Sequence, residues 1–349
     1  MNRLFLSILL SVMSILGASA DTASRVRKAL EPYSADPTIG VAVVLADGDT
    51  VGVNADKRFS LESVMKFYQA VALSHILGER VLDDSVHVTA SDLKAGTWSP
   101  LRARYPEGGI TVTPAFLLDY SLQMSDNNAA DILFDRYGSP AKLDSVVRAV
   151  SRARDFALRY TEDEMHGDTT RCTFNNATPA DAATLMFDYF CFDPNSAAVQ
   201  AIMARPTPFG TKRLLAGFPE GKATVLHKTG TGFNATGHTG NINDAGFVFY
   251  PRADGSFGFY SIAVFLADRE GSAAEAEALI AEISEAVWAA HLASDMEYAL
   301  SGTVPAGRKR PARYEAPDED NPGWFAAFAG AVLGAMVESA IDRALGIEE

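Results

Sequence analysis

Cysteine and positive charge are scarce in this sequence. Only two cysteines, Cys172 and Cys191, occur in 349 residues, too few for a disulfide-stapled miniprotein. The 30 Lys and Arg residues stand against 44 Asp and Glu, so the net charge is −14 and no surplus of cations is available to bind nucleic-acid phosphates. No apolar run reaches the about 20 residues that a membrane-spanning helix needs. We therefore expect neither a nucleic-acid partner nor a transmembrane span.

Apolar residues, in contrast, are abundant. They make up 48% of the chain and aromatic residues 10%, which is enough for a buried core and excludes a disordered protein.

Whether the two cysteines form a disulfide stays open from the sequence. A helix that begins near Pro179 would place Cys191 beyond its far end, roughly 16 Å from its start, so the loop that holds Cys172 would have to fold back.

The N-terminus has the pattern of a cleavable secretory signal. Arg3 precedes a short apolar run over residues 4–16, and Ala18-Ser19-Ala20 then supplies small residues before Asp21. No cysteine follows the expected cleavage point, so no lipid attachment is predicted. We expect residues 1–20 to be removed and the protein to be secreted, with the periplasm as the expected compartment.

Strand-like and helix-like patterns alternate along the rest of the chain. The pattern predicts a helix, a strand pair, a block of helices, three strands and a long helix, in the ranges 22–30, 39–53, 63–190, 224–266 and 272–292. This order favours a mixed α/β (α+β) fold in which a helical part interrupts a sheet. We place the main domain at 21–292, with α/β parts at about 21–58 and 206–292 and a helical part at about 59–205.

Residues 293–349 form a C-terminal extension of different composition. A linker rich in Gly, Pro and charged residues leads to an apolar run over 324–337, which carries Gly330 and Gly334. This run is too short to cross a membrane and is followed by acidic residues. We expect a helix that docks on its own domain or on another subunit, in preference to one that lies on a membrane surface.

Three short motifs occur in order: Ser63-Val64-Met65-Lys66, Ser125-Asp126-Asn127 and Lys228-Thr229-Gly230. An S-x-x-K match alone is expected about once in a chain of this length. A second copy starts at Ser139, in a Gly-Ser-Pro loop, and is interpreted as a helix N-cap. Ser63 instead opens a strongly apolar helix, and Lys66 lies one turn later on the same face.

A lysine on a buried helix needs a physical reason, because an unpaired charge there is costly. One alternative is that the Lys66 side chain extends to the surface. The other is that its amine accepts or steers the proton of the Ser63 hydroxyl, which would make that hydroxyl a nucleophile.

The three motifs, with 62 and 103 residues between their starts, resemble those of the class A serine β-lactamases. The resemblance covers nearly all of residues 22–292 and implies an antiparallel five-stranded sheet flanked by helices, with an inserted all-helical domain. It implies that Ser63 is acylated, with Lys66 as its proton partner, and that Ser125 passes a proton to the lactam nitrogen.

The same resemblance assigns residues that bind the substrate. Asn127 would hold the side-chain amide of the substrate, while Lys228 and Thr229 would bind its carboxylate and polarise Ser125. The backbone N–H groups of Ser63 and Thr231 would form the oxyanion hole.

A carboxylate between the second and third motifs would activate the water that releases the acyl group. The run Tyr160-Thr161-Glu162-Asp163-Glu164-Met165-His166 resembles the T-E-x-[QE]-M-H pattern of the PER-like subgroup, so Glu162 is the expected base and Glu164 the second choice. His166 stands where most members have an Asn that helps to hold this water. Tyr160 replaces the usual Arg, which puts the ordinary salt bridge of this loop in doubt.

Two further positions match the family near the substrate. Trp98 in Trp98-Ser99-Pro100 would stack on the substrate at the mouth of the site, with a core tryptophan as the alternative. Arg213, in a segment that resembles T-G-x-x-R-[LI], would supplement Lys228, with a surface arginine as the alternative. His227 and His238 lack the spacing of a metal site, so neither a metal nor another cofactor is predicted.

The resulting hypothesis is a secreted β-lactam hydrolase that acts on penicillins or cephalosporins through an acyl-enzyme. Two alternatives remain: a D-Ala-D-Ala peptidase or penicillin-binding protein, and a penicillin-sensing module that stays acylated and uses residues 293–349 for contact. The sequence leaves open the preference among penicillins, cephalosporins and carbapenems, and also the oligomeric state.

Overall fold

The computed structural model describes residues 21–205, 207, 209–233, 239–251, 257–269 and 271–300. The expected signal segment and residues 301–349, which include the expected docking helix, lie outside these ranges. No helix in the described part of the chain is both long and apolar enough to cross a membrane.

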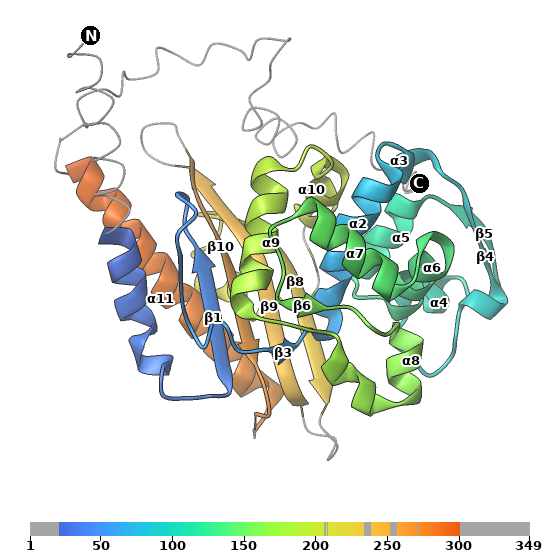
Figure 1. Cartoon of the computed structure of the whole chain (residues 1–349), viewed down its shortest axis with the longest axis horizontal. Helices are drawn as coiled ribbons and strands as arrows, with labels where there is room; N and C mark the ends of the chain where they lie inside the picture. The colour runs from blue at the N-terminus through green and yellow to red at the C-terminus, as the bar shows by residue number, and fades with distance from the viewer. Residues whose placement is uncertain are drawn as a thin grey trace, which may run out of the picture.

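An antiparallel sheet forms the centre of the fold (Figure 1), in the order β2-β1-β10-β9-β8. This arrangement confirms the five-stranded sheet that the resemblance implies. Its strands come from both ends of the described chain: β1 (Ile39–Val44), β2 (Thr50–Val53), β8 (Thr224–Phe233), β9 (Thr239–Pro251) and β10 (Phe257–Leu266). The first strand pairs with the last, with Ile39 opposite Leu266. This pairing joins the two ends of the described chain in one sheet.

Alternation along the strands divides the core into two layers. Val41 and Val43 of β1 face one way and pack with the helix over residues 21–30 and with α11 (Ala273–Leu300). Ala42 and Val44 face the other way, toward α9 (Pro179–Phe192) and the helical part. Both faces are therefore covered, which explains why all residues of β1 are buried.

The helical part is built around α2 (Met65–Leu77), whose residues are buried on nearly every side. The helices and 3₁₀ turns of this part are η2 (Glu62–Val64), α3 (Arg80–Asp83), η3 (Ala90–Asp92), α4 (Pro100–Arg104), α5 (Pro114–Gln123), α6 (Asn127–Tyr137), α7 (Pro140–Val150), α8 (Glu162–Gly167), η4 (Thr169–Phe174) and α10 (Ala197–Met203). Two turns lie outside it, η1 (Glu31–Tyr33) and η5 (Leu214–Gly217).

Several sequence expectations need correction. The part expected to be all helical also contains two small sheets. One pairs β4 (Val86–Thr89) with β5 (Gly108–Val112), and the other pairs β7 (Asn176–Ala177) with both β3 (Phe59–Ser60) and β6 (Phe156–Ala157). The strand expected from residue 224 continues to Phe233, and the last helix runs past residue 292 to Leu300.

The two cysteines are free thiols in this structure. Cys191 lies within the last turn of α9 rather than beyond it, and Cys172 lies in η4. Burial raises the pKa of the Cys172 thiol to about 11. The second S-x-x-K match is a helix cap as predicted, because the Ser139 hydroxyl accepts a hydrogen bond from the N–H of Lys142.

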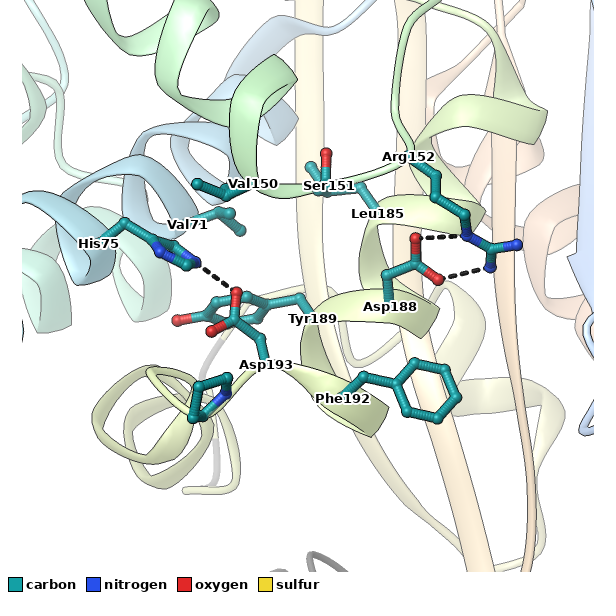
Figure 2. A pocket seen from close by; sticks show the side chains of 11 residues that line it. Val71, His75, Val150, Ser151, Arg152, Leu185, Asp188, Tyr189, Phe192 and Asp193 are labelled. Carbon is teal, nitrogen blue, oxygen red and sulfur yellow. Dashed lines mark hydrogen bonds and ion pairs between the residues drawn. The ribbon is translucent and has the colours of Figure 1, made fainter.

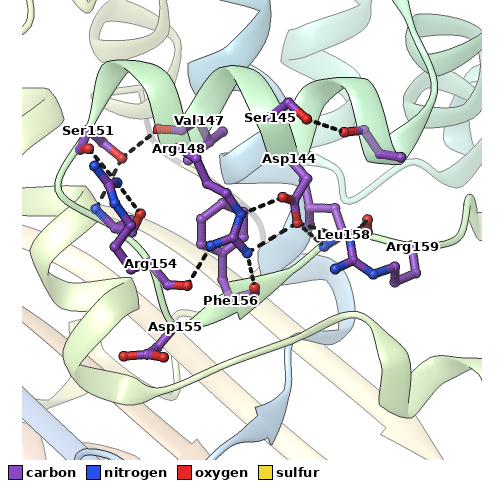
Figure 3. A network of polar contacts seen from close by, with 12 residues as sticks. Asp144, Ser145, Val147, Arg148, Ser151, Arg154, Asp155, Phe156, Leu158 and Arg159 are labelled. Carbon is purple, nitrogen blue, oxygen red and sulfur yellow. Dashed lines mark hydrogen bonds and ion pairs between the residues drawn. The ribbon is translucent and has the colours of Figure 1, made fainter.

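A buried carboxylate holds the chain segment that leads into α8 (Figure 3). Asp144 of α7 accepts hydrogen bonds from Arg148 Nε, at 2.6 Å, from the Leu158 N–H, at 3.0 Å, and from Arg159 Nη1, at 3.2 Å. The Arg148 guanidinium also stacks on the Phe156 ring, 4.3 Å from its centroid. One side chain thus fixes the path of the segment over 154–159.

We expect Asp144→Ala to lower the free energy of unfolding by about 2–4 kcal/mol, because it leaves the buried Leu158 N–H without an acceptor and removes the ion-pair partner of Arg148 and Arg159. Asp155→Ala is the matched control, since Asp155 is exposed and lies 3.5 Å from Arg58. The control should change stability by less than about 1 kcal/mol. Urea denaturation measures both, and equal losses would show that the network does not anchor this segment.

Candidate active site

The Ser63 hydroxyl and the Lys66 amine meet at the start of α2. Ser63 lies in the 3₁₀ turn η2, which leads directly into α2. Its Oγ is 3.0 Å from Lys66 Nζ. The Lys66 side chain is fully buried, so it does not extend to the surface. Its nitrogen also contacts the Ser125 carbonyl oxygen at 2.9 Å, Asn127 Oδ1 at 2.6 Å and Glu162 Oε1 at 2.9 Å. The amine is therefore held by four oxygen atoms.

The second motif forms a strained turn before α6. Ser125 has a φ of +54°, in the left-handed region that non-glycine residues rarely adopt. Asp126 caps α6 by accepting from the Ala129 N–H and also accepts from the Leu101 N–H. The turn therefore points the Ser125 carbonyl at Lys66, while the Ser125 hydroxyl faces β8.

Asn127 is held at both ends of its amide. Its Oδ1 accepts from Lys66, and its Nδ2 donates to Thr97 Oγ1 at 2.8 Å. Sequence reasoning did not identify Thr97, although this residue stands directly before Trp98. One of the two Nδ2 hydrogens is therefore engaged with Thr97, and the other stays available for the substrate.

The third motif supplies Lys228 from β8. Lys228 Nζ donates to Ser125 Oγ at 3.0 Å and to the Thr229 carbonyl at 2.8 Å. Burial, followed by the positive charge of Lys66, holds the pKa of Lys228 well below its usual range. Ser125 thus lies between the two lysines, with its carbonyl on one and its hydroxyl on the other.

Arg213 is buried, so the surface alternative is wrong. Its guanidinium donates to the Gly230 carbonyl at 2.8 Å, to the Asn243 carbonyl at 2.9 Å and to Thr231 Oγ1 at 2.7 Å. Nε lies 3.2 Å from Glu277 of α11. Arg213 therefore braces β8 and β9 just beyond the third motif and fixes the hydroxyl of Thr231.

His227 has an internal partner. Its Nδ1 lies 3.0 Å from the buried carboxylate of Asp244 on β9. His238 lies outside the described residues. No group of three His, Cys, Asp or Glu side chains within the described ranges is arranged to hold a metal ion.

The loop carboxylate Glu162 opens α8 and is itself almost buried. Its position is fixed through the backbone, because Asp131 of α6 accepts from the N–H of Glu162 at 2.8 Å and from that of Asp163 at 2.9 Å. Burial and the nearby charge of Glu162 raise the pKa of Asp131 to about 7. Asp131, six residues after the start of the second motif, was not identified from the sequence.

Glu164 and His166 lie on the exposed side of α8. Glu164 closes a capping box, since its Oε2 accepts from the Thr161 N–H at 2.9 Å. His166 Nδ1 lies 3.3 Å from the carbonyl oxygen of Glu162, one turn earlier in the same helix.

Arg171 and Phe174 both contact the ring of Tyr160, which lies two residues before Glu162. The guanidinium of Arg171 lies 5.0 Å from the Tyr160 ring centroid, and Phe174 packs edge-on at 6.0 Å. Asn175 adds three contacts, because its Oδ1 accepts from the N–H groups of Arg159 and Tyr160 and its Nδ2 donates to the Tyr160 carbonyl. Tyr160 is therefore held by ring contacts and by backbone hydrogen bonds to Asn175.

Trp98 stands at the rim, so the core alternative is wrong. Its side chain is 54% exposed, and its indole N–H donates to the Met124 carbonyl at 2.9 Å. Phe209 packs edge-on against it, with ring centroids 5.8 Å apart. The segment in which Phe209 replaces the usual Thr therefore supplies a second aromatic ring to this rim.

A separate cavity of about 310 Å³ lies farther along α2 (Figure 2). Its charged groups are paired with one another: His75 with Asp193 at 2.5 Å, and Arg152 with Asp188. It contains none of the motif residues. The residues of the three motifs, together with Glu162, instead lie where η2, α6, α8 and β8 meet.

Comparisons with known proteins agree with this geometry. A family model described as the Beta-lactamase enzyme family matches residues 21–291. A β-lactamase of Phocaeicola vulgatus is 32% identical to this chain, over 72% of this chain and 79% of the relative. The extended-spectrum β-lactamase PER-1 of Pseudomonas aeruginosa is 30% identical, over 72% of this chain and 82% of the relative. The solved class A β-lactamase of Bacteroides cellulosilyticus superposes with a TM-score of 0.69 at 32% identity, covering 77% of this chain and 98% of that one.

The raised pKa of Asp131 predicts a pH-dependent contribution to stability. Because folding favours its neutral form, this contribution is complete below the unfolded pKa of 3.8 and is lost as the pH rises through about 7. The free energy of unfolding of Asp131→Asn minus that of the wild type should thus increase by about 3 kcal/mol between pH 4 and pH 8. Asp163→Asn, in the same turn, is the control that should keep the wild-type slope in urea denaturation. A pH-independent difference for Asp131→Asn would contradict the prediction.

Proposed function

The chain belongs to the β-lactamase enzyme family and is a class A β-lactamase; we propose that it opens the lactam amide of penicillins and cephalosporins through an acyl-enzyme on Ser63. The observation that carries this proposal is the contact of one buried amine, Lys66, with both the hydroxyl of Ser63 and the carboxylate of Glu162. A nucleophile, a proton acceptor and a second base are the groups that acylation and hydrolysis require.

In the acylation step, Lys66 first passes its proton to the Glu162 carboxylate, 2.9 Å away, so that its amine is neutral. The Ser63 hydroxyl then attacks the lactam carbonyl carbon and its proton passes to Lys66. Lys66 later gives this proton to Ser125 and regains its own from Glu162, which is again a carboxylate. The backbone N–H groups of Ser63 and Thr231 stabilise the negative charge on the carbonyl oxygen. Ser125 then gives its proton to the lactam nitrogen as the C–N bond breaks, and Lys228 supports this transfer from 3.0 Å. The depressed pKa of Lys228 makes it a suitable proton donor or acceptor in this exchange.

Other residues bind the substrate in this proposal. Lys228 and Thr229 receive the carboxylate, with Arg213 fixing Thr231 at the same edge of β8. Asn127 meets the side-chain amide with the second hydrogen of its Nδ2, while the first stays on Thr97. Trp98 stacks on the substrate at the rim, where its exposure leaves one face available.

In the deacylation step, Glu162 takes a proton from a water molecule that attacks the Ser63 ester. Ser63 Oγ and Glu162 Oε1 both lie within 3.0 Å of Lys66 Nζ, a spacing that one water molecule can bridge. The buried setting of Glu162 and its backbone bonds to Asp131 support this role, whereas Glu164 is occupied as a capping residue. His166, which the resemblance expects to help hold this water, is exposed, and its Nδ1 contacts the backbone carbonyl of Glu162.

Export completes the proposal. Residues 1–20 would act as a cleavable signal that delivers the enzyme to the periplasm, where cell-wall antibiotics act. A peptidase or a penicillin sensor would share the acylation machinery but would not need a buried base beside the ester. The position of Glu162 therefore favours the hydrolase over both alternatives.

Glu162→Gln should still acylate but should accumulate the acyl-enzyme, because the water loses its base. Hydrolysis of a chromogenic cephalosporin should fall by at least about 100-fold, with a stoichiometric burst, and mass spectrometry should find the adduct on Ser63. Glu164→Gln is the matched control and should retain turnover close to wild type.

If Glu162→Gln turns over normally while Glu164→Gln stalls, the assignment of the base is wrong. A single burst from the wild type itself, with no further turnover, would instead favour the peptidase or the sensor.

A further inference from the structure

Glu62, the residue directly before the nucleophile, has no role in the scheme above. It has a φ of +50°, a strained conformation that an acidic residue rarely adopts. Its carboxyl group turns back toward the sheet, where Oε1 accepts from Asn241 Nδ2 of β9 at 2.8 Å and contacts Ser60 Oγ at 2.8 Å. The side chain thus ties the turn that carries Ser63 to the sheet.

The carboxyl group also lies directly against Gly232 of β8. A Cβ at Gly232 would be 2.3 Å from Glu62 Cδ and 2.5 Å from each carboxyl oxygen, so any other residue there would have to displace the Glu62 carboxyl group. Gly232 follows Thr231 in the chain, and Glu62 precedes Ser63. Glu62 and the glycine that its carboxyl group approaches are therefore the chain neighbours of the two residues whose N–H groups form the proposed oxyanion hole.

A hydrogen count at Ser60 favours the neutral form of Glu62. The single hydroxyl hydrogen of Ser60 has two possible acceptors, Glu62 Oε1 and the Cys172 carbonyl at 2.9 Å. If Glu62 carries a proton on Oε1, it can donate to Ser60 Oγ, and the Ser60 hydroxyl can then donate to Cys172. Both short contacts are satisfied only in this way.

The charges around Glu62 agree with this count. Across the described chain, no ion pair includes Glu62, whereas the carboxylate of Glu162 on α8 acts on it with like charge. The Cys172 thiol faces it from η4, and Asn241, which is uncharged, faces it from β9. Burial first, and then Glu162, raise the pKa of Glu62 above its ordinary value.

We propose that Glu62 is a positioning residue that works as the neutral acid, and that its ionisation as the pH rises slows acylation of Ser63. The neutral form holds the nucleophile turn against β8 and β9 without adding charge. A negative charge at this place would oppose the negative charge that develops on the lactam oxygen in the transition state. This inference rests on the proposed acylation of Ser63 and its oxyanion site.

The test compares acylation rates of the wild type, Glu62→Gln and Glu164→Gln with a fluorescent penicillin between pH 5 and pH 9.5. The ratio of Glu62→Gln to wild type should be near one at low pH and should grow to about tenfold or more at high pH, because only the wild type gains a charge. Glu164→Gln removes an exposed carboxylate nearby and should keep a flat ratio. Glu62→Ala also removes the charge, so its ratio should grow in the same way from a lower starting value.

A melting-temperature series of the free proteins gives a readout that does not depend on activity. Because the pKa of Glu62 is raised by folding, the stability it contributes is complete below its unfolded pKa and is lost as the pH rises through the folded pKa. Glu62→Gln should therefore gain melting temperature relative to the wild type as the pH rises.

The outcomes distinguish a failure of the role proposed for Glu62 from a failure of the proposed acylation of Ser63. A flat ratio for both Glu62 variants, or a melting difference that does not change with pH, overturns the role of Glu62 while leaving acylation intact. Absence of any covalent adduct on wild-type Ser63 overturns the proposed function itself, and the melting series then still decides whether Glu62 is neutral.

Discussion

The ammonium group of Lys66 has no access to water, and the site is arranged around the need to compensate it. A buried charge is tolerated only when it is paired and hydrogen-bonded, and here a carboxylate, two amide-type oxygens and a hydroxyl surround one nitrogen. These partners come from η2, α6 and α8, which are distant in sequence. Compensation of this charge therefore requires the three elements to meet at one point, and that meeting point is the active site.

Two of the four non-glycine residues with a positive φ in the described chain, Glu62 and Ser125, lie at the same point. They adjoin or belong to the groups that are proposed to react. The approach of β8 to the nucleophile turn is close, since a Cβ at position 232 would meet the Glu62 carboxyl group. Such strained conformations persist only where the surroundings hold them, and here strand pairing and buried hydrogen bonds do so.

The loop that carries Glu162 shows how a family fold tolerates the loss of a usual contact. Tyr160 replaces an arginine, and its ring is instead held between Arg171 and Phe174, while Asn175 binds its backbone. Upstream, Asp144 fixes the entry to the loop, and Asp131 fixes its end through two backbone N–H groups. The segment around Glu162 is thus held by several contacts, none of which is an ion pair of residue 160.

Sequence by itself indicated the main elements and the candidate reacting groups of this protein, because periodicity and local motifs depend on neighbouring residues. The sheet, the buried helix after Ser63, the cap at Ser139 and the three motifs are of this kind. Only tertiary structure decided that Asp131 and Thr97 position the site, that Arg213 is buried, that Trp98 is exposed and that the two cysteines stay apart. These features depend on contacts between segments far apart in the chain, and burial and hydrogen-bond partners are set there rather than by local sequence.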